Sequence, residues 1–162
     1  LGIGNIASVI RMIEKLGGNT EVISTPNEIL SAKKLVLPGV GSYDAGMGQI
    51  NNLGLKDNLV RMVEAQKTPI LGICLGMQLL FNSSEESPGD GLKLINGKIK
   101  KLPHKDETLA LPRIGWRLVD FGKDYLGSLG APSQKSKYYF VHSYGFFEDE
   151  ECDVNSNFNE IV

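Results

Sequence analysis

Short apolar runs alternate with amphipathic helical segments through the first half of the chain. Residues 35–37 (Leu-Val-Leu) and 70–73 (Ile-Leu-Gly-Ile) carry no polar side chain. Residues 6–16 and 55–63 instead repeat apolar side chains at helical spacing. Strands without in-and-out alternation are typical of parallel sheets that helices cover on both faces. We therefore predict an α/β fold with a mostly parallel sheet.

The remaining segments predict further elements. We expect a strand at residues 21–24, a helix at 75–81, a hairpin over 92–102 that turns at Asn96-Gly97, and strands at 115–121 and 138–142. Thr25-Pro26-Asn27-Glu28 has the form of a capping box at the start of a helix. Residues 120–137, rich in Gly and Ser, predict an exposed loop or a short helix with loops. No repeat or linker divides the chain, so we expect one domain over residues 1–162.

Composition excludes several classes of partner and site. Lys plus Arg number 17 and Asp plus Glu number 19, for a net charge of −2, which argues against nucleic-acid binding through bulk electrostatics. No apolar stretch approaches the roughly 18 residues of a membrane span. Two distant cysteines, Cys74 and Cys152, form neither a disulfide framework nor a zinc site. A reducing, cytoplasmic setting fits this cysteine usage.

Cys74 lies where the apolar run 70–73 gives way to the predicted helix. It is flanked by Gly72 and Gly76, two residues before and two after. Small residues at these positions allow a sharp turn that exposes a nucleophile and admits a substrate. The start of the following helix would stabilise a thiolate, and the Leu75 N–H would face a developing oxyanion. The alternative is a buried core cysteine, the common state of a free thiol.

Two other segments are weaker candidates for a functional role. Gly39 and Gly41 follow the strand at 35–37, where glycines expose backbone N–H groups to a ligand or simply form a turn. His142 ends the run 138–142 and is either a site residue or a histidine hydrogen-bonded at a strand end.

Together these segments resemble the class I glutamine amidotransferases, an α/β family with a flavodoxin-like sheet. Residues 72–78 (Gly-Ile-Cys-Leu-Gly-Met-Gln) resemble the family's nucleophile motif, and residues 38–41 its oxyanion loop. Residues 4–9, 79–86, 114–116 and 139–144 resemble signatures of one branch, the glutaminase subunits of imidazole glycerol phosphate synthase. The resemblance runs from about residue 1 to residue 145.

The resemblance implies a chemistry and a set of site residues. Cys74 would attack the carboxamide of L-glutamine, giving a glutamyl thioester and ammonia, and water would then release glutamate. Gly39, Val40 and the Leu75 amide would form the oxyanion hole, with the Val40 peptide reorienting as the partner binds. The glutamine pocket would be lined by Gly41, Gln78, Glu86, His142, Ser143 and Tyr144. No cofactor or metal is implied.

The resemblance also implies a partner for the ammonia. In this branch ammonia passes to a cyclase of (β/α)₈ barrel type, and the heterodimer makes imidazole glycerol phosphate and AICAR in histidine biosynthesis. Arg113 stands where the usual subunit carries a histidine. This difference keeps open a paralogous branch that feeds ammonia to an enzyme amidating a sugar for surface polysaccharides.

One catalytic element of the family is not found in these residues. The family's general base is a histidine in a late His-Pro-Glu motif, whereas His104 and His142 lie earlier and neither has Glu two residues on. The chain begins at Leu1, not methionine, so we expect a fragment that lacks the first strand of the fold. We expect the general-base histidine and its orienting glutamate to lie beyond Val162. The alternatives are a non-catalytic binding module that has lost the base, and an unrelated cysteine hydrolase of the same doubly wound type.

Overall fold

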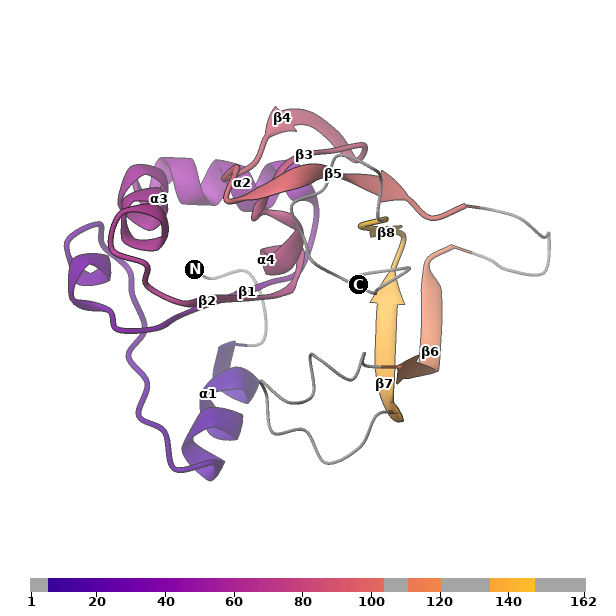
Figure 1. Ribbon diagram of the computed structural model, residues 1–162, viewed down its shortest axis with the longest axis horizontal. Helices are drawn as coiled ribbons and strands as arrows, with labels where there is room; N and C mark the ends of the chain where they lie inside the picture. Colours follow the sequence, from indigo (N-terminus) through magenta and orange to yellow (C-terminus); the bar gives the residue numbers. More distant parts are fainter. Residues whose placement is uncertain (1–5, 104–110, 121–134, 148–162) are drawn as a thin grey trace.

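The computed structural model describes residues 6–103, 111–120 and 135–147 (Figure 1). In chain order its elements are α1 (Ile6–Lys15), the 3₁₀ helix η1 (Glu28–Ser31), β1 (Leu35–Gly39), α2 (Tyr43–Asn52), α3 (Lys56–Glu64), β2 (Ile70–Cys74), α4 (Leu75–Gln78), β3 (Phe81–Ser84), β4 (Ser87–Asp90), β5 (Ile95–Lys101), β6 (Arg113–Asp120), β7 (Lys135–His142) and β8 (Tyr144–Gly145). Helices and strands alternate as far as α4, and strands follow. The predicted α/β class is confirmed.

β1 and β2 form the parallel pair that positions the candidate site. Their register runs from Leu35 opposite Ile70 to Gly39 opposite Cys74. Both strands therefore end at the same edge of the sheet. Ligand sites of open α/β sheets lie at this edge, beyond the carboxyl ends of the strands.

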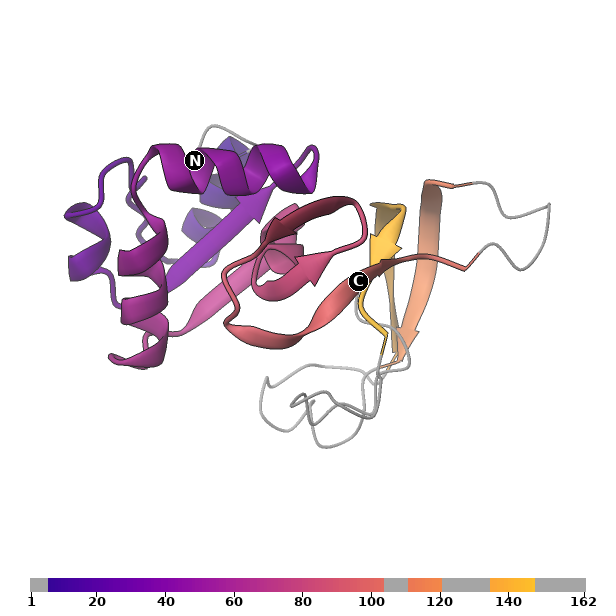
Figure 2. The same ribbon diagram turned by 90° about the horizontal axis from the view of Figure 1, so that it is seen from above.

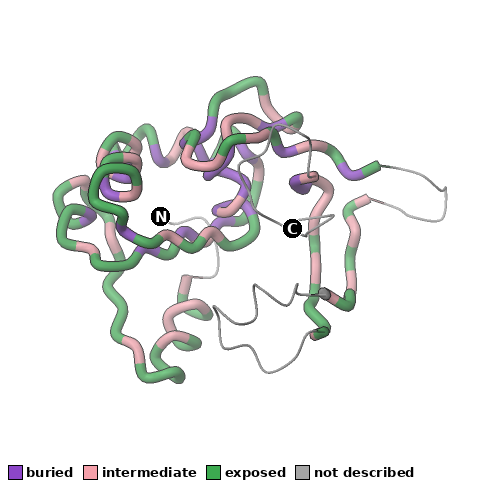
Figure 3. Tube along the Cα trace, viewed as in Figure 1, coloured by how far each residue is buried: buried purple, intermediate pink, exposed green. Residues whose placement is uncertain are grey.

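The main core lies on one face of this pair. Leu35 and Leu37 pack with buried side chains of α2, α3 and α4, among them Ile50, Leu59 and Leu75. Figure 3 shows the buried residues gathered in this region, whereas α1 and the β6–β7 ribbon contain none among their described side chains. On the other face of the pair, Val36 and Leu71 are 38% and 59% exposed. The burial of β1 thus alternates, although its sequence is apolar throughout.

The other strands form two further sheets of mixed direction. One has the order β4-β3-β5-β8, with β3 and β5 parallel and the outer pairs antiparallel. The other is the antiparallel ribbon β6–β7, which extends at one side of the molecule in both views (Figures 1 and 2). The ribbon confirms the strands predicted at 115–121 and 138–142. Most of the predicted loop at 120–137 lies outside the described residues.

The predicted hairpin over residues 92–102 is wrong. Asn96 and Gly97 lie inside β5, and the pairing with β3 shifts here: Phe81 lies opposite Ile95 but Ser83 lies opposite Lys98. Gly97 has a φ of +137°, and a Cβ there would lie 2.7 Å from the Phe146 ring. The dipeptide therefore forms a bulge under an aromatic ring rather than a turn. The tight turn is at Glu85-Glu86, between β3 and β4.

Helix α1 is where the sequence predicts it, and it ends at Lys15, two residues before Gly17, whose φ is +82°. The predicted strand at residues 21–24 does not form. The Glu28 carboxylate accepts the N–H groups of Ser24 and Thr25 at 2.7 and 3.1 Å, which is the glutamate half of the predicted capping box. A 3₁₀ helix follows, and its N-cap residue is Asn27 rather than Thr25. None of the described helices has the length and apolar character that crossing a membrane requires.

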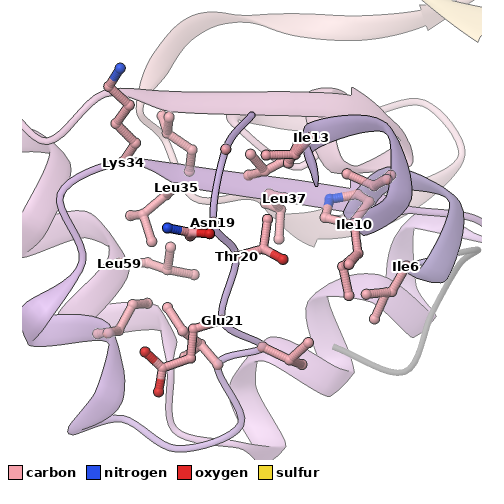
Figure 4. Close-up of a pocket in the computed structure, with 18 of the residues that line it drawn as sticks. Ile6, Ile10, Ile13, Asn19, Thr20, Glu21, Lys34, Leu35, Leu37 and Leu59 are labelled. Atoms are coloured by element: carbon pink, nitrogen blue, oxygen red, sulfur yellow. The ribbon is translucent and has the colours of Figure 1, made fainter. Parts of the chain in front are cut away.

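A hollow of about 470 Å³ separates α1 from α3. Figure 4 shows apolar side chains of α1, β1 and α3 around it, including Ile10, Leu37 and Leu59, with Asn19 and Thr20 from the segment after α1. None of the candidate site residues lines this hollow. It is therefore separate from the site described next.

Candidate active site

Cys74 occupies a strained turn between β2 and α4. Its φ and ψ are 55° and −122°, a conformation that L-residues with a Cβ avoid. Such strain costs on the order of 1–3 kcal/mol and persists at functional sites where the surroundings enforce it. Cys74 is also exposed to solvent. The predicted nucleophile turn is therefore present, and the alternative of a buried core cysteine is wrong.

The glycines around Cys74 let backbone pack directly on backbone. A Cβ on Gly76 would lie 1.7 Å from the Leu37 carbonyl oxygen, and a Cβ on Gly72 would lie 2.4 Å from the Met77 Cα. Because neither glycine has a Cβ, the backbone of the turn packs against β1 and the backbone of α4 packs against β2. The predicted helix at 75–81 is shorter, since α4 ends at Gln78 and β3 begins at Phe81.

The loop after β1 lies beside the nucleophile. Gly39 is the register partner of Cys74, and a Cβ on Gly39 would lie 2.8 Å from the Gly76 nitrogen. Gly41 has a φ of +106°, a region that only glycine adopts readily. Val40, between them, is 53% exposed. The structure thus brings Gly39 next to Cys74 and Leu75, and Gly41 follows two residues later in the same loop.

Gln78 links the nucleophile helix to the segment after β7. Its buried side-chain amide donates to the Tyr144 carbonyl oxygen at 3.3 Å. The same carbonyl oxygen lies 3.1 Å from His142 Nδ1. His142 is therefore hydrogen-bonded at the end of a strand, which is one of the two roles that the sequence allowed. The Ser143 carbonyl accepts the Leu102 N–H at 2.9 Å.

Glu86 reaches the site from the turn between β3 and β4. Its Oε2 accepts the backbone N–H of Tyr43 at 3.2 Å, at the first residue of α2. Helix α2 is not predicted from the sequence, and neither is this contact. Within the described residues, no three His, Cys, Asp or Glu side chains gather as a metal site requires.

The histidine expected to act as general base for Cys74 falls outside the described residues. His104 lies in the segment 104–110, which is outside them. The general-base histidine and the orienting glutamate, expected beyond Val162, also lie outside the described residues, which end at residue 147. The nucleophile turn and the loop beside it are therefore the part of the predicted catalytic site that the structure places, and the base stays a prediction.

Tyr43 is fully buried behind the loop, and its hydroxyl has no hydrogen-bond partner among the described residues. Burial raises the pKa of Tyr43 to about 12, and the Asp90 charge adds to the shift. The phenol in the folded protein thus stays neutral up to a higher pH than in the unfolded chain.

Replacing Tyr43 by Phe should stabilise the protein by about 1 kcal/mol, because a buried unpaired hydroxyl costs roughly 1–3 kcal/mol. Urea denaturation at pH 7 measures this gain. The unfolded phenol ionises near pH 10. Wild-type stability should therefore fall as pH rises from about 10 towards 12, and that fall should be smaller in Tyr43→Phe. A Phe variant less stable than wild type at pH 7 would mean that the hydroxyl is paired.

Comparisons with known proteins decide the family. A sequence profile described as "Glutamine amidotransferase class-I" matches residues 1–156. The chain belongs to the class I glutamine amidotransferases.

Several curated relatives of this class I glutamine amidotransferase are named as HisH subunits of imidazole glycerol phosphate synthase. An "Imidazole glycerol phosphate synthase subunit HisH 2" from Methanococcus maripaludis is 45% identical over 144 residues, covering 88% of this chain and 70% of the relative. A subunit HisH from Pasteurella multocida is 40% identical over 162 residues, covering 98% and 78%. A solved "Crystal structure of glutamine amidotransferase" matches the fold with a TM-score of 0.72 at 15% identity, over 92% of this chain and 72% of that one.

Proposed function

We propose that this amidotransferase is the glutaminase subunit of an imidazole glycerol phosphate synthase, acting in histidine biosynthesis. The observation that carries the proposal is the strained, exposed Cys74 lying opposite Gly39 at the carboxyl edge of a parallel pair. The names of relatives at 34–45% identity support the choice of branch. One family profile over residues 1–156 supports treating residues 1–162 as one domain.

In the proposed reaction the Cys74 thiolate attacks the side-chain carbonyl carbon of L-glutamine. The general base, which has taken the thiol proton, gives that proton to the leaving nitrogen as the C–N bond breaks, so ammonia departs and a glutamyl thioester remains. The base then takes a proton from water, which adds to the thioester carbonyl carbon. The C–S bond breaks, the sulfur receives the proton back, and glutamate departs. We propose that the base is the histidine of a His-Pro-Glu element beyond Val162, because the residues up to Val162 contain no His followed by Glu two residues on.

We propose that the N–H groups of Gly39, Val40 and Leu75 stabilise the oxyanion. The exposure of Val40 and the positive φ of Gly41 support a loop whose central peptide can reorient. We further propose that the α-amino and α-carboxyl groups of glutamine bind among Gly41, Gln78, Glu86, His142, Ser143 and Tyr144. The contacts among Gln78, His142 and Tyr144 support this grouping.

The proposed partner is a cyclase subunit of (β/α)₈ barrel type, which receives the ammonia through a channel. The complex would be cytoplasmic and would act as a lyase. The alternative partner is a sugar-amidating enzyme, which Arg113 keeps under consideration because the usual subunit carries histidine there.

Reconstituting the protein with each candidate partner distinguishes the cyclase from the sugar-amidating enzyme. The protein is purified with the cyclase of its own histidine pathway and, in parallel, with a sugar-amidating synthase, and glutamate release is measured with the synthase substrate present. We expect a stable complex and glutamine-dependent imidazole glycerol phosphate only with the cyclase. Glutamine turnover that requires the sugar-amidating enzyme would overturn the assignment.

A further inference from the structure

Helix α2 begins directly after the loop at residues 39–42, and its first turn lacks the usual local cap. The N-cap residue Ser42 makes no side-chain hydrogen bond to the backbone N–H groups of the helix. Its hydroxyl bonds the Asp44 carboxylate, which also accepts the backbone N–H groups of Ala45 and Asp44, and these bonds lower the pKa of Asp44. The first N–H groups of a helix have no acceptor within the helix. The N–H of Tyr43, the first residue of α2, takes its acceptor from a distant part of the chain.

Glu86, which lies 43 residues further along the chain, supplies the acceptor for the Tyr43 N–H. Its Oε2 accepts the Tyr43 N–H at 3.2 Å. Its own backbone N–H donates to Ser84 Oγ at 3.1 Å, and Ser84 is a buried residue of β3 paired with Ile99 of β5. The backbone of Glu86 is thus bonded to the β3–β5 strand pair, and its carboxylate is a negative group at the positive end of α2.

We infer that Glu86 is a positioning residue for the oxyanion loop, and that it couples occupancy of the glutamine pocket to the geometry of that loop. The inference rests on the proposed function for the pocket. One carboxylate oxygen fixes Tyr43, and the other can accept the α-ammonium group of glutamine. Both contacts use the same carboxylate. A bound glutamine would therefore fix the Glu86 side chain, and Glu86 in turn would fix residues 39–42 beside Cys74.

Two variants of Glu86 separate positioning from substrate binding. Glu86→Gln keeps an oxygen acceptor for the Tyr43 N–H but loses the charge that attracts an ammonium group. In the complex with the synthase partner we expect it to raise KM for glutamine about tenfold or more, with kcat within about threefold of wild type. Glu86→Ala removes the acceptor as well, and its kcat should fall at least about tenfold further. Equal kcat values in the two variants would overturn the inference.

Amide hydrogen exchange tests positioning without glutamine or partner. In Glu86→Ala the amides of residues 39–45 should exchange about tenfold faster than in wild type, while Glu86→Gln stays near wild type. Glu85→Ala is the matched control, because the neighbouring Glu85 carboxylate bonds Lys101 N at 2.9 Å and does not contact the loop.

Unchanged exchange at residues 39–45 in Glu86→Ala, or faster exchange spread over the whole chain, would overturn the inference. If local exchange changes as expected but the wild-type complex does not hydrolyse glutamine, the proposed function fails and the positioning role stands. The two failures are therefore distinguishable.

Discussion

Replacing Cys74 with Ser should abolish glutamine-dependent synthesis while ammonia-dependent synthesis by the partner survives. Serine keeps the size of the side chain but is a far weaker nucleophile, and loss of a covalent nucleophile lowers kcat by about 10³-fold or more. In the proposed complex the synthase reaction uses ammonia at a separate site on the partner, so added ammonium salt should restore product formation to within about twofold of wild type. Both activities are measured on the same complex.

Cys152→Ser is the matched control, because Cys152 is the other cysteine of the chain and stands in the acidic stretch 148–153. It should retain glutamine-dependent turnover. If Cys74→Ser lost both the glutamine and the ammonia reactions while the complex stayed intact, Cys74 would be a structural residue and the proposed chemistry would be wrong.

The second large effect is expected at Gly76. A Cβ here would lie 1.7 Å from the Leu37 carbonyl oxygen, a backbone atom that moves only if β1 moves. Overpacking a tight site costs about 1–3 kcal/mol and occasionally more. We therefore expect Gly76→Ala to lower the free energy of unfolding by about 3 kcal/mol or more, measured from the urea midpoint. Glutamine turnover should fall too, because β1 carries the oxyanion loop.

Gly48→Ala is the control, and we expect it to change the free energy of unfolding in the opposite direction. Gly48 lies in α2, and a Cβ there would have no neighbour within 4 Å. Alanine is the better helix former by about 1 kcal/mol, so this variant should be slightly more stable than wild type. Equal effects of the two substitutions would contradict the backbone contact between the nucleophile turn and β1.

The candidate site was predictable where local sequence alone determines it. An apolar run followed by Gly-x-Cys-x-Gly specifies a strand, a sharp turn and an exposed thiol, and the structure has all three at Cys74. Gly39 and Gly41 were recognisable as a loop after a strand. The position of Gly39 beside Cys74 depends on the register of β1 and β2, which the resemblance to a family supplied and local patterns did not.

Long-range contacts account for most of what sequence reasoning missed. Helix α2 contains Gly46 and Gly48, which weaken its helical pattern, and it is held by burial of Tyr43, Met47 and Ile50. Asn96-Gly97 is the strongest short hairpin signal, yet pairing with β3 and the Phe146 ring determine its conformation. The bond from Glu86 to Tyr43 joins segments 43 residues apart, and no local motif reports it.

The most direct test of the account is to locate the covalent intermediate. The full protein in complex with its synthase partner is treated with a diazoketone analogue of glutamine, digested, and analysed by mass spectrometry. We expect one label per chain on Cys74, with glutamine protecting it and Cys152 unmodified. A partner-bound preparation in which Cys74 stays unlabelled would contradict the claim that this thiol attacks glutamine.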